Sequence, residues 1–239
     1  MTSRPRSATC RRTRRELVAA AECVLFDFDG PLAGLFGHYR AHDVARVLRR
    51  RLDDWRLTPV LDAPDNPLQV LRDTSRAYRG TVWGYRVAEL QRLLTAEEVR
   101  AAGSAVPTEH ARELVFWLVA RGSKVAVTTN NSVEAANVYL ARMGLTSFFG
   151  AHVHGRPADP ALLKPDPFCL REALRTTGTR AEDCLMIGDS ADDCTAARAA
   201  GVTFLGYARN EAKRRELEDA GAEHIADALA HLFEEGRQL

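Results

Sequence analysis

Two carboxylates one residue apart follow a short apolar stretch near the start of the chain. Residues 23–26 read Cys-Val-Leu-Phe, and Asp27 and Asp29 come directly after them, before Gly30. A short apolar run that ends in a turn signal is typical of a buried strand, along which side chains alternate between faces. Both carboxylates are therefore expected to point the same way. Because two close carboxylates repel unless a cation separates them or one holds a proton, the pair indicates either a hard metal ion or a nucleophile beside an acid/base.

A purely structural explanation of this pair is that the two aspartates end a strand and cap a helix, because aspartate is an ordinary turn residue. Polar residues at the ends of the other predicted strands bear on this choice, since ligands bind outside the carboxyl ends of the strands in doubly wound sheets. Such residues follow the later strands: Thr128, Thr129 and Asn130, then Lys164, then Asp189, Asp192 and Asp193. The combined set suits an anion bound by Thr129 and Lys164. It also suits a hard cation bound through oxygen atoms by Asp27, Asp29 and Asp189.

An anion site beside a cation site is what phosphoryl transfer requires, because the transferred group carries charge on its oxygens. The sequence has no His placed near a Ser and no Cys–His pair, so the evident nucleophile is an aspartate. Carboxylate nucleophiles form aspartyl-phosphate intermediates. These residues therefore indicate an enzyme that acts on a phosphorylated compound.

The elements that must hold these residues alternate between strands and helices over most of the chain. The predicted strands are residues 23–26, 125–127, 148–153, 184–187 and 202–205. The predicted helices are residues 38–52, 68–79, 87–102, 108–120, 166–174 and 191–200, and one more that begins at a capping box of Asn131 and Glu134 and ends at Met143. Strands that alternate with helices imply a parallel sheet covered on both faces. The fold class is therefore predicted to be α/β, with a doubly wound parallel sheet.

A block of helices interrupts this alternation between the first and second strands. Residues 36–103 are therefore predicted to form an inserted helical cap, and residues 16–35 and 104–239 an α/β core. Residues 1–15 contain six arginines and no acidic residue, so they are predicted to form a solvated, mobile tail that buries no core. An alternative for this tail is an organelle transit peptide, which shares its Arg-rich and Ser-rich composition.

The composition argues against several classes of protein. Lys and Arg total 33 against 32 Asp and Glu, a balance that argues against a nucleic-acid-binding or membrane-coating protein. The five cysteines are far apart and form no Cys-x-x-Cys pair, so they indicate neither a zinc site nor disulfides, and a reducing cytoplasm is expected. No apolar stretch approaches the roughly 18 residues that span a bilayer. A soluble cytoplasmic protein with a small phosphorylated substrate as its partner is expected, with no nucleic-acid or membrane partner and no pattern that indicates an oligomeric state.

Four motifs of this chain, in their order and spacing, resemble those of the haloacid dehalogenase (HAD) superfamily. They are Asp27-Phe28-Asp29-Gly30, Thr129-Asn130, Lys164-Pro165 and Gly188-Asp189-Ser190-Ala191-Asp192-Asp193, with Ala196 to Gly201 after them. The resemblance extends from Val24 to about Tyr207. It implies a Rossmann-like core with an inserted cap, a Mg²⁺ cofactor and a phosphatase-like hydrolase activity.

The resemblance also implies a role for each site residue. Asp27 is implied to be the nucleophile and Asp29 the general acid/base. The implied phosphate-binding residues are Thr129, Asn130 and Lys164, and the implied magnesium ligands are Asp27, Asp29, Asp189 and Asp193. Asp29 is implied to bind the metal through its backbone carbonyl, which leaves its carboxylate free for proton transfer. Asp193 is implied either to support the metal or to hold its loop.

One departure from the family pattern is Pro31, where threonine is usual. Proline supplies neither a hydroxyl nor a backbone N–H, so a local hydrogen bond that steadies the loop is expected to be absent. The predicted function is Mg²⁺-dependent hydrolysis of a small phosphorylated metabolite through an aspartyl-phosphate intermediate. A phosphomutase uses the same residues and is an alternative, as is a non-catalytic binding protein with this fold, while Asp29 argues against a dehalogenase.

Two weaker signals concern substrate recognition. The predicted cap carries a cluster of cations and aromatic rings: Arg76, Arg79, Trp83, Tyr85 and Arg86. This cluster is predicted either to face the leaving group of a substrate or to form a solvated helix face with its rings packed inward. A polar strand end carries His152, His154 and Arg156. These residues are either substrate contacts or an ordinary end of a strand.

Overall fold

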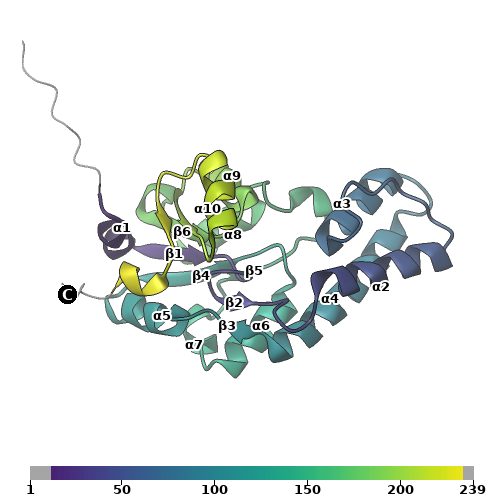
Figure 1. The fold of residues 1–239 in the computed structure, drawn as a ribbon. Helices are drawn as coiled ribbons and strands as arrows, with labels where there is room; N and C mark the ends of the chain where they lie inside the picture. The colour runs from purple at the N-terminus through teal and green to yellow at the C-terminus, as the bar shows by residue number, and fades with distance from the viewer. Residues whose placement is uncertain (1–11, 234–239) are drawn as a thin grey trace, which may run out of the picture.

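The computed structural model describes residues 12–233, and their centre is a parallel sheet of six strands. The strand order is β5-β4-β1-β6-β7-β8, so β1 lies inside the sheet (Figure 1). The strands are β1 (Cys23–Phe26), β4 (Lys124–Thr128), β5 (Val153–His154), β6 (Cys184–Gly188), β7 (Thr203–Tyr207) and β8 (Ile225–Ala226). Cys23 pairs with Lys124 on one side and with Cys184 on the other. The carboxyl ends of β1, β4 and β6 therefore lie side by side.

Both faces of the sheet are buried, which explains why β1 is apolar along its whole length. Val24 and Phe26 belong to the apolar cluster on one face, and Cys23 and Leu25 to the cluster on the other. The first face is covered by α1 (Arg14–Ala20), α5 (Ala111–Ala120), α6 (Val133–Arg142) and α7 (Thr146–Phe149), and the second by α8 (Phe168–Thr177) and α9 (Ala191–Ala200). Figure 1 shows α5, α6 and α7 on the side of the sheet opposite to α8 and α9. The predicted α/β class with a doubly wound parallel sheet is confirmed.

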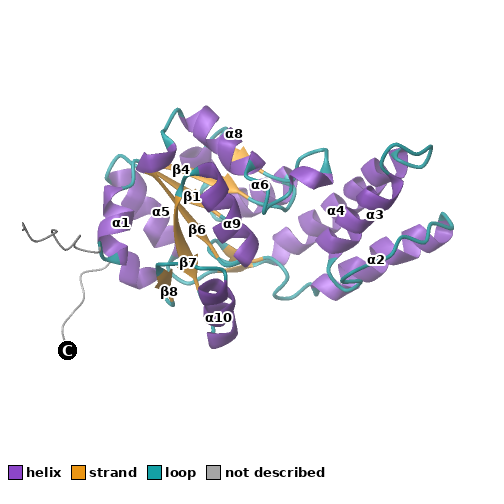
Figure 2. Cartoon of the chain, turned by 90° about the horizontal axis from the view of Figure 1, so that it is seen from above, coloured by secondary structure: helices purple, strands orange, loops and turns teal. Residues whose placement is uncertain are grey.

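Three further helices pack against one another beyond the carboxyl edge of the sheet (Figures 1 and 2). They are α2 (Ala41–Asp54), α3 (Pro67–Tyr78) and α4 (Tyr85–Ser104). Their shared apolar cluster includes Leu48, Leu71 and Leu90. Two short antiparallel strands, β2 (Ala33–Gly34) and β3 (Val106–Pro107), join the chain where it leaves and re-enters the core. These helices form the predicted cap, whose boundaries at residues 36 and 103 stay a prediction.

Helix α4 belongs to both the cap and the core. Near its start, Leu90 and Leu94 are fully buried in the cap cluster. Near its end, Ala101 and Ala102 are fully buried in the cluster against the sheet. The helix therefore continues from one apolar cluster into the other, and the residues between these two pairs lie at the junction of cap and core.

The folded structure begins inside the segment that was predicted as a tail. Helix α1 starts at Arg14, inside the predicted tail of residues 1–15, because Thr13 forms a capping box with Glu16. Arg14 Nη1 donates to Ile225 O at 2.9 Å. Arg14 is thus held against the core, while residues 1–11 of the predicted tail lie outside the described residues.

The predicted strand at residues 148–153 is wrong over most of its length. Phe148 and Phe149 lie in the short helix α7, and of the predicted strand only Val153 is in β5. Phe149 is fully buried, with its ring centroid 6.3 Å from that of Phe26. A helical turn thus packs an aromatic ring onto the sheet, and the strand that follows pairs at its edge for only two residues.

The other predicted helices occur, with ends that differ from the prediction by up to three residues. The predicted capping box of α6 is wrong, because its N-cap is Ser132, whose side chain accepts a hydrogen bond from Ala135 N. Asn131 instead directs its side chain at Glu98. Helix α10 (Glu211–Asp219), strand β8 and helix α7 were not predicted, nor were the short helical turns η1 (Pro160–Leu162), η2 (Ala181–Asp183) and η3 (Leu229–Leu232). In α10 only Leu217 is buried, so no apolar periodicity marked it.

Within residues 12–233, no helix combines the length and the apolar character that crossing a membrane requires. The longest helix there is α4, with 20 residues, and its polar and charged residues are spread along its length.

The hydroxyl of Tyr139 on α6 supports the loop that follows β1. It donates to Leu32 O at 2.6 Å in a buried setting. We expect Tyr139→Phe to lower the free energy of unfolding by about 1 kcal/mol, because the buried Leu32 carbonyl loses one of its two donors and keeps only Thr108 N, 3.1 Å away. Urea unfolding measures this loss. In the control Tyr78→Phe, the lost hydrogen bond to Thr58 N is exposed and water replaces it, so an equal loss in both variants would contradict the assignment.

Candidate active site

The loop after β1 carries both aspartates of the first motif and makes a tight turn. Asp27 N donates to Ile187 O at 2.9 Å, which continues the ladder between β1 and β6. Gly30 has a φ of +133°, and a Cβ at this position would lie 2.6 Å from Asp189 Cγ. Glycine therefore allows the loop after β1 to touch the loop after β6. The result is that Asp27, Asp29 and Asp189 lie in one region of the sheet edge.

Pro31 supplies neither a hydroxyl nor an N–H to this loop, and the hydrogen bonds that hold the loop come from other residues. Gly30 N donates to Ala33 O at 2.7 Å, and Ala33 N donates to Phe28 O at 3.0 Å. The hydroxyl of Thr108, which follows the cap in sequence, donates to Gly30 O at 2.5 Å. The loop is therefore held by hydrogen bonds that residue 31 does not make.

Lys164 lies at the centre of the site, with a buried ammonium group. Its Nζ donates to Asp27 Oδ1 at 2.8 Å, to Thr128 O at 2.9 Å and to Asp193 Oδ1 at 2.5 Å. Burial acts to lower the pKa of Lys164, but Asp193 and Asp27 outweigh it and hold the pKa above its usual value. The lysine is therefore charged and joins the loop after β1 to the end of β4 and to the first turn of α9.

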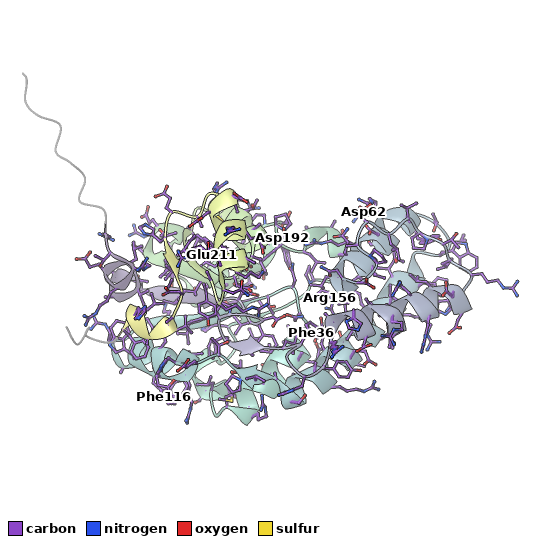
Figure 3. All side chains as sticks on the ribbon, in the orientation of Figure 1. Phe36, Asp62, Phe116, Arg156, Asp192 and Glu211 are labelled. Carbon is purple, nitrogen blue, oxygen red and sulfur yellow. The ribbon has the colours of Figure 1, made fainter. Side chains whose placement is uncertain are left out.

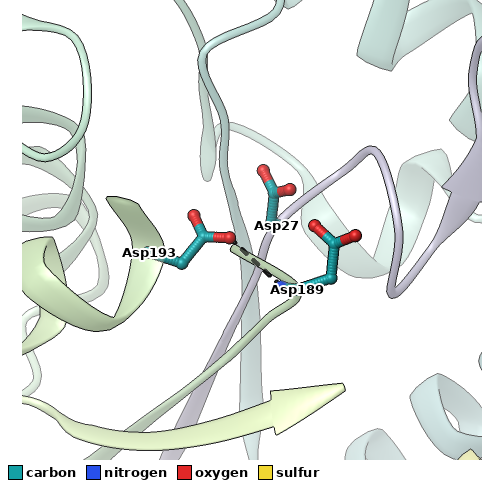
Figure 4. A group of neighbouring side chains, drawn as sticks. All are labelled: Asp27, Asp189 and Asp193. Atoms are coloured by element: carbon teal, nitrogen blue, oxygen red, sulfur yellow. Dashed lines mark hydrogen bonds between the residues drawn. The ribbon is translucent and has the colours of Figure 1, made fainter. Parts of the chain in front are cut away.

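Asp193 holds the loop that follows β6. Its Oδ2 accepts hydrogen bonds from Asp189 N at 3.2 Å (Figure 4), from Ser190 N at 3.1 Å and from Ser190 Oγ at 2.7 Å. The Ser190 hydroxyl in turn caps Asp193 N, which makes a capping box at the start of α9. Both oxygens of Asp193 are thus engaged, one with the loop and one with Lys164.

Three buried carboxylates form a group that can hold a cation. Oxygen atoms of Asp27, Asp189 and Asp193 lie within 4.8 Å of one another (Figure 4). Burial raises the pKa of Asp27 to about 7, against the attraction of Lys164 and with added repulsion from Asp193 and Asp189. Burial also raises the pKa of Asp189 to about 6. The donor set is all oxygen, as a hard cation such as Mg²⁺ requires, and a divalent charge here would offset the repulsion among the carboxylates.

The side chain of Asp29 is not part of this carboxylate group. Its Oδ1 accepts a hydrogen bond from Leu35 N at 2.8 Å. Burial raises the pKa of Asp29 to about 6, although the hydrogen bond from Leu35 opposes the rise. Asp29 therefore has one oxygen fixed by the backbone, and its pKa lies closer to neutral pH than that of an ordinary aspartate.

Thr129 and Asn130, the predicted phosphate-binding residues, both follow β4. Asn130 Oδ1 accepts from Lys164 N at 2.8 Å and Asn130 Nδ2 donates to Lys164 O at 3.1 Å, so its side chain clamps the lysine backbone. The Thr129 hydroxyl donates to Asn131 Oδ1 at 3.2 Å and accepts from Asn131 N. The hydroxyl of Thr128 is buried without a hydrogen-bond partner among the residues that the structure describes. Contact of Thr129 or Asn130 with phosphate stays a prediction.

Comparison with known proteins identifies the family. A model of the haloacid dehalogenase-like hydrolases matches residues 21–201, which is most of the chain. The chain belongs to the haloacid dehalogenase-like hydrolases. The resemblance seen in the four motifs is thereby confirmed at the level of the family.

Members of this family whose sequences resemble the chain include phosphoglycolate phosphatases. The protein from Cereibacter sphaeroides is 30% identical over 223 residues, 88% of this chain and 98% of that protein. The protein from Rhodospirillum rubrum is 37% identical over 128 residues, 51% of this chain and 52% of that protein. The chain thus spans about half the length of several of the curated relatives that it matches.

Solved structures of the HAD fold superpose on the chain at low sequence identity. The structure of CbbY from Rhodobacter sphaeroides in complex with phosphate is 21% identical, covers 89% of this chain and 96% of its own, and has a TM-score of 0.65. A hydrolase from Pseudomonas syringae is 20% identical, covers 88% of this chain and 94% of its own, and has a TM-score of 0.63. These likenesses show the fold of the family.

The HAD motifs did not reveal two cations that border the site. Arg72 on α3 donates to Lys164 O, and it pairs with Asp192 Oδ2 at 3.2 Å (Figure 3 labels Asp192). Lys213 on α10 lies 3.4 Å from Asp189 Oδ2 and 3.2 Å from Glu216 Oε2. Arg72 is one of many polar residues on the cap helices, and Lys213 comes after the last motif. Neither residue therefore belongs to a sequence motif that could have predicted its place at the site.

The cationic cluster predicted in the cap makes its ion pairs outside the group of motif aspartates. Two of its arginines pair with aspartates: Arg76 with the exposed Asp62 and the buried Asp73, and Arg79 with Asp159. A groove of about 770 Å³ runs along these arginines and the turn at residues 160–167, and its lining includes none of the motif aspartates. The two rings of the cluster, Trp83 and Tyr85, are exposed and not packed inward as the alternative predicted. The proposed contact of this cluster with a leaving group stays a prediction.

The contribution of Lys164 to stability can be tested by removing its charge. We expect Lys164→Met to lower the free energy of unfolding by about 3–5 kcal/mol in metal-free buffer at neutral pH, because it leaves buried carboxylates without their cation. Thermal or urea unfolding measures the loss. The matched control is Lys124→Met, which removes an exposed lysine whose Nζ contacts Thr177 O. Equal losses in the two variants would show that Lys164 does not neutralise the site.

Proposed function

We propose that this protein is a Mg²⁺-dependent phosphatase that hydrolyses a small phosphorylated metabolite through an aspartyl-phosphate intermediate. The observation that carries the proposal is the buried contact of Lys164 with Asp27, 2.8 Å apart, beside Asp189 at the carboxyl edge of the sheet. This places a candidate nucleophile beside a fixed positive charge, as transfer of an anionic group requires. Relatives named phosphoglycolate phosphatase support the substrate class, and phosphoglycolate is the first compound to test.

The proposed first step is attack by a carboxylate oxygen of Asp27 on phosphorus. A new O–P bond forms while the P–O bond to the leaving alcohol breaks, and the electron pair stays on the alcohol oxygen. Asp29 then supplies the proton to that oxygen. Because Leu35 N occupies Asp29 Oδ1, Oδ2 is the atom proposed to carry the proton. The raised pKa of about 6 leaves a fraction of Asp29 protonated near neutral pH.

The proposed second step releases inorganic phosphate and regenerates the nucleophile. Asp29, now a carboxylate, takes a proton from water as the water oxygen attacks phosphorus. The bond between phosphorus and Asp27 breaks, and its electron pair returns to the Asp27 carboxylate. Lys164 is proposed to stabilise the phosphoryl oxygens in both steps, because its ammonium group is already fixed beside Asp27.

The residues proposed to hold Mg²⁺ are Asp27 and Asp189 through their carboxylates and Asp29 through its carbonyl. When bound, the ion supplies Lewis-acid polarisation of a phosphoryl oxygen and admits an anionic substrate among carboxylates. Asp193 is proposed to hold the loop and not to bind the metal directly, because its Oδ2 already accepts three hydrogen bonds and its Oδ1 pairs with Lys164.

Metal dependence is the first test of this proposal. We expect hydrolysis of p-nitrophenyl phosphate to be lost in EDTA and restored by Mg²⁺, since close carboxylates repel an anionic substrate without a cation. We also expect Asp189→Asn to raise the Mg²⁺ concentration for half-maximal activity by at least about 10-fold. Steady-state assays across a magnesium titration measure both effects.

The control for this test is Asp192→Asn, which changes a neighbouring carboxylate that pairs with Arg72. It is expected to leave the magnesium requirement unchanged. Full activity in EDTA would refute the metal assignment. A panel of phosphoglycolate, sugar phosphates and nucleotides then defines the substrate, and transfer of phosphate to a second acceptor instead of water would identify a phosphomutase.

The two aspartates of the first motif are expected to respond differently to the same substitution. Asp27→Asn keeps the shape of the side chain but removes the nucleophile, so neither turnover nor a covalent phosphoenzyme is expected. Asp29→Asn keeps the backbone carbonyl and removes the proton donor, so kcat is expected to fall roughly 10²–10⁴-fold. Single-turnover assays with intact-mass analysis measure both outcomes.

The leaving group separates these two roles. A substrate whose alcohol leaves readily as an anion needs little protonation, so it is expected to recover part of the activity lost in Asp29→Asn. It is expected to recover none of the activity lost in Asp27→Asn. Equal recovery in both variants, or full activity in either, would show that the proposed division of roles is wrong.

A further inference from the structure

A buried carboxylate of the cap-spanning helix contacts the loop that follows β4. Glu98 on α4 is fully buried. Its Oε1 accepts from Asn131 Nδ2 at 3.1 Å and from Arg156 Nη1 at 2.7 Å, and its Oε2 accepts from Ser132 N at 2.9 Å. Two of its three hydrogen bonds therefore go to the segment directly after Thr129 and Asn130.

The arginine that pairs with Glu98 contacts the same segment. The side chain of Arg156 is 2% exposed and lies between the sheet and the cap (Figure 3). Its Nη1 also donates to Asn130 O at 3.3 Å, and its backbone N donates to Asn131 O at 2.7 Å. Its Nη2 donates to Thr95 Oγ1 at 2.8 Å, one turn before Glu98 on α4. Three of the side-chain hydrogen bonds of this pair reach the loop at residues 130–132, and two more tie Arg156 to α4.

This network continues to the hydroxyl of Thr129. The Thr129 Oγ1 donates to Asn131 Oδ1 at 3.2 Å and accepts from Asn131 N at 3.1 Å. The amide of Asn131 is itself oriented by Glu98, because its Nδ2 donates to the carboxylate and its Oδ1 is left to face Thr129. The rotamer of the threonine therefore depends on a carboxylate that approaches from another element.

A buried ion pair is weak evidence of a contribution to stability, since a well-packed apolar pair of similar volume often stabilises a protein as much. The directions of these hydrogen bonds indicate a different role. Apart from each other and Thr95, the side-chain partners of Glu98 and Arg156 in this network are in the loop at residues 130–132. The charges therefore fix the position of this loop.

We propose that Glu98 and Arg156 are positioning residues that hold the loop after β4 in the geometry that binds phosphate. The proposal rests on the proposed function of Thr129 in the same site. In this proposal α4 connects the cap to the loop after β4. The helix packs in the cap cluster before Glu98 and in the core cluster after it. The position of the cap is thereby coupled to the geometry of the phosphate-binding loop.

The test uses Glu98→Gln in the full chain. Glutamine keeps the shape of the side chain but has one acceptor oxygen, so it cannot accept from both Asn131 and Ser132. The chain offers a matched control in the neighbouring residue. Glu97 is also buried on α4, but its carboxylate contacts Tyr39 and Arg100 and not the loop. Glu97→Gln therefore removes a similar charge without touching residues 129–132.

The readout is the affinity for inorganic phosphate, measured by isothermal titration calorimetry in the presence of Mg²⁺, together with kcat and KM for p-nitrophenyl phosphate. We expect Glu98→Gln to weaken phosphate binding and raise KM roughly 10- to 100-fold, since misplacement of a binding group costs about this much. The fall in kcat is expected to be smaller. Glu97→Gln is expected to keep the phosphate affinity of the unsubstituted protein even where its melting temperature falls.

Two further variants separate positioning from stability. Arg156→Lys keeps the charge and is expected to retain part of the phosphate affinity, whereas Arg156→Met is not. In the double variant Glu98→Gln with Arg156→Met no unpaired charge is buried, so its melting temperature is expected to exceed that of Arg156→Met alone. Its phosphate affinity is expected to stay low, because the loop still lacks its support.

The inference is overturned if Glu98→Gln binds phosphate as tightly as Glu97→Gln, or if the double variant regains phosphate affinity together with stability. Failure of the proposed function gives a different result. An unsubstituted protein that binds phosphate but hydrolyses no phosphate ester would refute the phosphatase proposal and leave the loop comparison intact. If the unsubstituted protein is active and Glu98→Gln changes neither its phosphate affinity nor its KM, the positioning role alone is refuted.

Discussion

A buried ammonium group between two carboxylates is the interaction on which the candidate site at the carboxyl edge of the sheet depends. Lys164 Nζ lies 2.8 Å from Asp27 and 2.5 Å from Asp193, and its side chain is 3% exposed. Carboxylates buried without a cation carry a large desolvation cost, so the lysine, which reaches both, stabilises the loop after β1 and the first turn of α9 in their buried positions. The lysine backbone is in turn held by Asn130 from the loop after β4 and by Arg72 from the cap. The loops after β1 and β4, the first turn of α9 and the cap helix α3 therefore all contact Lys164.

The cap and the core share more than a connection through the chain. Helix α4 is buried at Leu94 among cap residues and at Ala101 against the sheet. Between these positions, Glu98 meets Arg156 in a setting closed to solvent. Because hydrogen bonds in such a setting strengthen as water is excluded, they fix the helix more firmly than an exposed pair does. The loop at residues 129–132 is thus held from the cap side by this pair and from the core side by the sheet.

The sequence by itself determined the sheet core and the sites along its edge. A strand that is buried on both faces is apolar along its whole length. The strand before Asp27 and Asp29 could therefore be predicted from its local sequence alone. The order of the motifs then indicated which strand ends meet, since parallel strands of a doubly wound sheet bring their carboxyl ends to one edge. In this way Lys164 and Asp189 were predicted near Asp27, and the structure brings them together.

Only the tertiary structure decided which polar groups contact each other and how the chain packs where its local pattern is ambiguous. Glu98 and Arg156 are 58 residues apart, and neither stands in a local pattern that distinguishes a buried pair from two surface charges. The aromatic run at Phe148 and Phe149 suits a strand by propensity, yet it forms a helical turn because that turn buries an aromatic ring against the sheet. Local spacing determined the strands β1, β4, β6 and β7 and the order of the motifs. Contacts between distant segments determined β5, β8 and the cap junction, because burial and pairing depend on neighbours that no single stretch contains.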